Sequence, residues 1–323
     1  MEDGMRLWAN PSSPHAEGRK AKAALEDARE RVKRALAWEG EVIFTSGASE
    51  ALAIALGRAK AERRAVSAAE HDAVFRAAPD AAVLPMHEGA VETAALDTVL
   101  AGEGRSLVAI QHLNPETGTI VLQQAAAGER VRSAGGLLLA DCAQSAGKIA
   151  LPDCDMAVVS AHKLGGPVGI GALLVRDFAL LEPVGGHERG YRPGTENLPA
   201  IMGFAAALDF AGDWRTDAAE RDAFAAELAG VRVAPGGEQA AHILALAHPS
   251  MSAQALLIRL DAMGFAVSAG SACSSGTLKK SRVLDAFAVA DDVAARTIRV
   301  SLGWSTTQDE LERFAAAWTS LCR

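Results

Sequence analysis

Short apolar runs, each followed by small or polar residues, recur between residues 41 and 166. "EVIFTSGASEALAIAL" joins such a run to a Ser-Gly turn and an apolar helical stretch; similar runs open "RAVSAAEHDAVFRAA", "SLVAIQHLNPETG", "GGLLLADCAQSAG" and "MAVVSAHKLGG". Short apolar strands that alternate with helices predict an α/β fold with a mostly parallel sheet covered by helices. Ligands bind beyond the carboxyl ends of strands in such sheets. The residues at these ends are therefore the first candidates for function.

The chain is expected to form two domains. The segment "AGDWRTDAAERDAF" is softer in composition, and we predict a large ligand-binding domain at 1–215 and a smaller C-terminal α+β domain at 216–323. The smaller domain should contain a helix from Ser252 to Met263. It should also contain a strand and an amphipathic helix in "TIRVSLGWSTTQDELERFAAAW", where Ser/Thr and acidic residues mark the helix start.

Composition argues against several classes of partner. The net charge of −8 and pI near 5.5 disfavour nucleic acid or an anionic membrane surface. No apolar run reaches the ~18–20 residues of a membrane span, and "MEDGMRLWANPSS" does not resemble a secretory signal. The four cysteines form no CxxC pair, which argues against a zinc site or a disulfide framework and predicts a reducing cytoplasm.

Three strand ends carry polar residues of interest. The amides and hydroxyls of "TSGAS" at a helix start suit a phosphate, although plain helix capping is the simpler explanation of this stretch on its own. His71, in "EHDAV", lies just past a strand, although a lone histidine is more often structural than functional. Asp141 ends the strand in "LADCAQ" and could either hold the positive charge of a heteroaromatic ring nitrogen or cap the next helix.

Lys163 lies at a fourth strand end, in "SAHKLGG". A lysine among small apolar residues can act as an amine nucleophile, whereas a solvent-directed surface lysine is the simpler alternative. Taken together, the phosphate cradle, the histidine, the aspartate and the lysine are the parts that hold pyridoxal phosphate. The aldehyde of this cofactor needs a lysine for its Schiff base, and the pyridinium nitrogen needs an acid. The combination predicts a pyridoxal phosphate enzyme.

Further stretches carry a family resemblance over nearly the whole chain. They are "NPSSPHAEGR", "FTSGASE", "AEHDAV", "NPETGTI", "ADCAQSAGK", "SAHKLGGPVGIGALLVR", "ERGYRPGTENLPAIMGFAAAL", "GSACSSG" and "IRVSLGWSTTQDE". In order and approximate spacing, the chain resembles the cysteine desulfurases of the class V aminotransferase family, which have the fold-type I architecture of pyridoxal phosphate enzymes.

The resemblance implies a role for each site residue. Lys163 would form the Schiff base, His71 would stack on the cofactor ring and assist proton transfer, and Asp141 would pair with the pyridine nitrogen. Gln144 would contact the phenolic oxygen of the cofactor. Its phosphate would be bound by Gly47, Ala48, Ser49, Ser160 and His162, with Thr195 reaching in from a dimer partner. Asn114 and Arg299 would bind the substrate carboxylate. No metal is implied.

The resemblance also singles out one cysteine. Cys273, in "GSACSSG", would be the nucleophile that takes sulfur from the substrate and carries it as a persulfide. Its glycine- and serine-rich surroundings suit a loop that moves. By contrast, Cys322 lies in the apolar "AAAWTSLC" and is expected to be a buried core cysteine, and Cys142 is expected to pack. Cys154 has no assigned role.

The implied activity is conversion of L-cysteine to L-alanine, with the sulfur passed to an acceptor or scaffold protein for iron–sulfur cluster assembly or thiolation. A homodimer follows from the role of Thr195, and a heterodimer with a full-length relative is the alternative. Other possible functions are selenocysteine lyase, aminotransferase, or a non-catalytic partner subunit. Relatives begin with a segment resembling "YLDNAATTP", whereas this sequence starts almost at "NPSS". That difference predicts either lost activity or a site completed by a partner chain.

Overall fold

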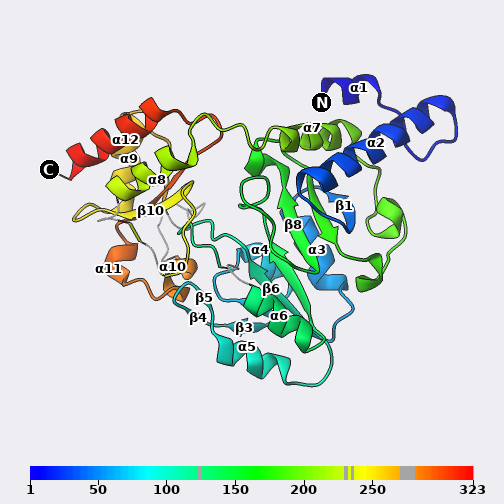
Figure 1. Cartoon of the computed structure of the whole chain (residues 1–323), viewed down its shortest axis with the longest axis horizontal. Helices are drawn as coiled ribbons and strands as arrows, with labels where there is room; N and C mark the ends of the chain where they lie inside the picture. Colours follow the sequence, from blue (N-terminus) through cyan, green and yellow to red (C-terminus); the bar gives the residue numbers. More distant parts are fainter. Residues whose placement is uncertain (122–124, 229–231, 234–235, 270–280, 323) are drawn as a thin grey trace. The chain divides into compact units, whose positions relative to one another are not determined.

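The computed structural model describes the 323-residue chain apart from residues 122–124, 229–231, 234–235, 270–280 and 323 (Figure 1). The chain divides into two compact units. The first consists of Met1–Leu84, Thr93–His112 and Gln124–Gly212, and the second of Pro85–Glu92, Leu113–Gln123 and Asp213–Arg323.

A seven-stranded sheet forms the centre of the first unit. Its strands, in spatial order, are β1 (Glu41–Thr45), β9 (Gly171–Val175), β8 (Met156–Ser160), β7 (Leu137–Asp141), β6 (Ser106–Gln111), β2 (Arg63–Ser67) and β3 (Ala82–Leu84). Only β9 runs antiparallel to its neighbours, so the expected mostly parallel sheet is confirmed. The connection from β8 to β9 holds just a 3₁₀ turn, η1 (Ala161–Leu164), instead of the crossover helix that a parallel return requires.

Helices cover both faces of this sheet. Along β1, Ile43 joins the core cluster on the α3 side with Leu52, while the neighbouring Phe44 points to the other face and stacks under Arg29 of α2. On that other face α6 also packs against β7, and α7 lies along α2 (Figure 1). The α-helices of this unit are α1 (Glu2–Arg6), α2 (Ala16–Ala35), α3 (Ala48–Arg58), α4 (Asp72–Ala77), α5 (Thr93–Leu100), α6 (Ala125–Ser133) and α7 (Leu198–Asp209), and two further 3₁₀ turns are η2 (Phe178–Leu180) and η3 (Glu188–Gly190).

The second unit is built on smaller antiparallel sheets. Its helices pack on the three-stranded sheet through a core that includes Leu244, Phe314 and Trp318. Its elements are the sheet β10 (Ile243–Ala247), β12 (Thr297–Ser301) and β11 (Ser268–Ala269), the hairpin β4 (Met86–His87) and β5 (Ala90–Val91), and the helices α8 (Ala218–Glu227), α9 (Ala253–Ala262), α10 (Arg282–Ala286), α11 (Asp291–Ala294) and α12 (Gln308–Leu321).

The predicted helix boundaries in the second unit agree with the structure. Ser252 caps α9 by accepting a hydrogen bond from Ala255 N, and Met263 is its C-cap. Thr307 and Glu310 form a reciprocal capping box at the start of α12. Within the described residues, no helix has both the length and the apolar character needed to cross a membrane.

The expectation for one cysteine is wrong. Cys322 is exposed because it falls at the C-cap of α12, beyond the last helical turn that packs into the core. Cys142 is fully buried, as expected of a packing residue, and Cys154 is also buried.

Candidate functional site

The carboxyl ends of the parallel strands gather most of the predicted residues at one edge of the first unit. His71 follows β2, Asp141 ends β7, and Lys163 lies in η1 directly after β8. Asp141 is paired in register with Gln111 of β6 and Val158 of β8, so the three strand ends are neighbours. This arrangement is where an α/β sheet binds its ligand.

The start of α3 offers amides to an anion. Gly47 is the N-cap, with φ of 148° and no side-chain cap, and a Cβ added there would meet nothing within 4 Å. The Ser46 amide is already taken by Glu50, whose carboxylate lies in the same turn. The amides of Ala48 and Ser49 thus lie at the positive, N-terminal end of the helix dipole and have no side-chain cap. This arrangement suits a phosphate.

Strand pairing places Ser160 beside this helix start. Gly171 of β9 is the register partner of both Thr45 and Ser160, and a side chain on Gly171 would collide with Gly47. The Oγ of Ser160 lies 3.0 Å from Nδ1 of His162. Burial, with a smaller contribution from Lys163, lowers the pKa of His162. This shift favours the neutral imidazole.

Asp141 is the electrostatic centre of this edge. Its Oδ1 accepts a hydrogen bond from Ala143 N at 2.9 Å, so the capping role is realised by one oxygen. Among the described residues none donates to Oδ2, which stays available for a ring nitrogen. Burial raises the pKa of Asp141. The hydrogen bond from Ala143 and the charges of His71 and Lys163 lower it, but by less, so the pKa is raised overall. Both side chains therefore lie within electrostatic range of the carboxyl group.

His71 and Lys163 are both exposed at this edge. Nδ1 of His71 accepts a hydrogen bond from Ala73 N at 3.1 Å and so caps α4. Because Nδ1 acts as an acceptor, a neutral ring carries its proton on Nε2. The turn that holds Lys163 closes at Gly165, where φ of 87° suits a glycine.

Three predicted residues stand apart from this set. Gln144 is half-buried in the turn after Asp141, and Thr195 is exposed on the loop after η3. Cys273 lies outside the described residues.

In the second unit, Arg299 and the Asn114 turn come together. Arg299 donates through Nη1 to Pro115 O and through Nη2 to Ser268 Oγ, both at 3.1 Å. Its Nε is buried without a hydrogen-bond partner among the described residues, and burial lowers its pKa despite the nearby Glu116. A half-buried arginine whose Nε is a spare donor fits a carboxylate ligand. The Oδ1 of Asn114 accepts hydrogen bonds from Glu116 N and Thr117 N, so this residue also shapes its own turn.

Sequence reasoning missed other polar residues at the edge of the first unit. Nδ1 of His112 lies 2.9 Å from the Oγ of fully buried Ser145, and burial lowers the pKa of His112 to about 4. Burial, with the charge of Lys163, lowers the pKa of Lys148 to about 8. The sequence signal that could have identified them is their position close to Asn114 in "IQHLNP" and to Gln144 in "AQSAGK".

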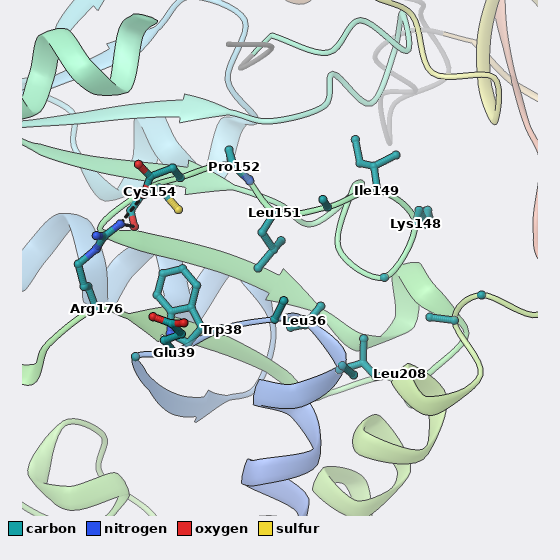
Figure 2. A pocket seen from close by; sticks show the side chains of 18 residues that line it. Leu36, Trp38, Glu39, Lys148, Ile149, Leu151, Pro152, Cys154, Arg176 and Leu208 are labelled. Atoms are coloured by element: carbon teal, nitrogen blue, oxygen red, sulfur yellow. Dashed lines mark hydrogen bonds and ion pairs between the residues drawn. The ribbon is translucent and has the colours of Figure 1, made fainter. Parts of the chain in front are cut away.

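A pocket of about 730 Å³ lies elsewhere in the first unit (Figure 2). It follows the connection from β7 to β8, where Lys148 and Leu151 line it, and reaches Trp38 before β1 and Cys154 before β8. Those strand starts form the edge of the sheet opposite to the carboxyl ends. The pocket therefore extends from Lys148 toward the opposite edge and is lined by none of the predicted residues.

The fold and these strand-end residues are typical of an α/β protein that binds a ligand at the carboxyl edge of its sheet. The model of the family "Aminotransferase class-V" matches residues 4–314, and the chain belongs to this family.

Individual relatives agree with this assignment. The chain is 34% identical over 341 residues to the cysteine desulfurase IscS of Anaeromyxobacter dehalogenans (strain 2CP-C), covering 93% of this chain and 82% of that protein. The X-ray structure of a NifS-like protein from Rickettsia africae ESF-5 superposes with a TM-score of 0.84 at 26% identity, over 99% of this chain and 94% of that one. SspA in complex with cysteine superposes with a TM-score of 0.76 at 26% identity, over 95% of each chain.

Members of this family depend on pyridoxal phosphate, and the first unit fits that cofactor. The first-turn amides of α3 lack a side-chain cap, open space adjoins Gly47, and Oδ2 of Asp141 has no described donor. Together with Lys163, these groups match the phosphate, the ring nitrogen and the aldehyde of the cofactor.

Proposed function

We propose that this chain is a pyridoxal phosphate-dependent cysteine desulfurase that converts L-cysteine to L-alanine and carries the sulfur as a persulfide on Cys273. The observation that carries the proposal is the clustering at one edge of the sheet, where His71 and Lys163 both lie within electrostatic range of Asp141. Relatives named cysteine desulfurase and a neighbour solved with cysteine support this substrate.

The proposed cofactor site lies in the large domain, residues 1–215. When bound, pyridoxal phosphate supplies an electron sink that acidifies the α-proton of the amino acid. Lys163 holds the aldehyde, and Asp141 keeps the ring nitrogen protonated. His71 stacks on the ring and moves the proton through Nε2, because Nδ1 is occupied by the α4 amide. Gln144 would contact the phenolic oxygen, and Gly47, Ala48, Ser49, Ser160 and His162 would surround the phosphate.

The proposed substrate groups lie in residues 113–123 and in the small domain, residues 216–323. Arg299 binds the carboxylate of cysteine through its guanidinium, with Asn114 beside Pro115 in the same turn. The Cys273 thiolate attacks the substrate sulfur: the new S–S bond forms as the C–S bond of the substrate breaks. The carbon skeleton then gains a proton and leaves as alanine.

We further propose a homodimer, in which Thr195 reaches the cofactor phosphate of the partner. Its exposure on its own chain supports this role. The persulfide would pass to an acceptor protein for iron–sulfur cluster assembly or thiolation. We propose a cytoplasmic location, which the free thiols of Cys142 and Cys154 support.

Two variants test the activity. Lys163→Ala should lose the visible absorbance of the bound cofactor and all alanine formation, because no other residue holds the aldehyde. Cys273→Ala should keep the absorbance and fail to release alanine from cysteine. If Cys273→Ala still gave alanine and persulfide at the wild-type rate, the assignment of the sulfur carrier would be wrong.

A further inference from the structure

Glu50 places a carboxylate at the helix start that is proposed to receive a phosphate. It lies in the first turn of α3, where its Oε2 accepts the amide of Ser46 and its Oε1 accepts Nε of Arg192 at 2.9 Å. Burial favours the neutral acid, but the hydrogen bonds from Ser46 and Arg192 outweigh it, so the pKa of Glu50 is below its ordinary value. The carboxylate is therefore charged at pH 7, in the helix turn proposed to receive a phosphate.

A negative charge in this turn has two opposite effects on a phosphate. By taking the Ser46 amide, Glu50 fixes the strand-to-helix bend and leaves the next amides to the ligand. Its charge, however, repels a phosphate dianion, and it offsets the favourable helix dipole. An arginine paired with the carboxylate removes this conflict. Arg192 and Glu50 are about one-fifth and one-quarter exposed, so solvent screens their charges only in part.

The loop that carries Arg192 is held firmly in place. Glu188 in the same loop is fully buried and pairs with Arg29 at 2.8 Å. Its Oε2 also accepts the amide of Phe44, two residues before Ser46 on the strand that leads into α3. The loop is thus anchored to β1 through Glu188 and to α3 through Arg192.

We infer that Glu50 and Arg192 are paired positioning residues of the phosphate site: Glu50 shapes the turn, and Arg192 neutralises Glu50 so that the turn accepts a dianion. The inference rests on the proposed pyridoxal phosphate site and assigns it a determinant of phosphate recognition.

The test measures binding of pyridoxal 5′-phosphate and of pyridoxal, which lacks the phosphate, to cofactor-free protein by absorbance titration. Arg192→Gln should weaken pyridoxal 5′-phosphate about tenfold, because a bare carboxylate then opposes the phosphate, and should leave pyridoxal within about twofold. Adding Glu50→Gln to Arg192→Gln should restore pyridoxal 5′-phosphate binding to within about threefold of wild type. A purely structural role would weaken both ligands and would not be rescued by a second substitution.

The control is Arg189→Gln in the same loop. Arg189 is half-exposed and pairs with Glu26 and with Glu41, which starts β1 at the end away from the α3 turn. This variant should leave both affinities within about twofold. If wild type binds pyridoxal 5′-phosphate more tightly than pyridoxal and Arg192→Gln keeps the same ratio of the two affinities, the inference is overturned. The proposed cofactor site would still stand in that case. Should wild type bind neither ligand, the proposed function fails, and the inference with it.

Discussion

The two edges of the large sheet differ in what marks them. At the carboxyl edge, Asp141 and Lys163 form a charged group with an altered carboxyl pKa. Near the opposite edge, the pocket of Figure 2 offers about 730 Å³ and even a thiol, Cys154. Burial and the charge of Asp155 raise the pKa of that thiol to about 12, so almost no thiolate exists at pH 7. Charge placement therefore agrees with the proposed site, whereas cavity volume points elsewhere.

The strongest test of this contrast is Asp141→Asn. The amide keeps the shape of the side chain and removes the charge that is proposed to hold a proton on the ring nitrogen. Alanine formation from cysteine should fall about hundredfold or more, as expected for loss of one preorganised electrostatic group. The urea midpoint of the cofactor-free protein should not fall, since the replaced carboxyl group is partly desolvated. A rate within threefold of wild type would remove Asp141 from the centre of this edge.

A second test uses the pH dependence of stability at the same edge. The pKa of His112 is about 4 in the folded protein and about 6.5 when unfolded. Between these values the unfolded chain binds the extra proton, so the stability present above pH 6.5 is lost as the pH falls toward 4. The cost is about 2 kcal/mol between pH 7 and pH 5.

Urea unfolding at pH 7 and pH 5 measures this cost. His112→Gln should remove most of the difference between the two pH values, whereas the matched control His87→Gln, at an exposed histidine in β4, should keep it. Equal pH dependence in wild type and His112→Gln would show that the buried imidazole is not held neutral by its surroundings.

Much of this edge could be predicted from the sequence because apolar strands end abruptly at polar residues. Asp141 and Lys163 were identified in that way, and the caps of α9 were equally local signals. The antiparallel direction of β9 was not predicted, because its apolar run resembles that of a parallel strand. Only the short connection between β8 and β9 distinguishes an antiparallel strand from a parallel one here. Contacts between distant segments also escaped, above all the Glu50–Arg192 pair, whose members are 142 positions apart.

The smallest expected effect comes from filling the pocket near the opposite edge. Ala150 is exposed and lines the pocket, so Ala150→Trp can occupy part of the space with no core side chain removed. Alanine formation should stay within about twofold of wild type, and the free energy of unfolding within about 0.5 kcal/mol, as for other surface substitutions. Steady-state assays and urea unfolding on the same preparation check both. A tenfold loss of rate at unchanged stability would mean that the pocket is coupled to the carboxyl edge. Lys148 would then be the first residue to test, because it lines the pocket and its pKa is lowered in part by the charge of Lys163.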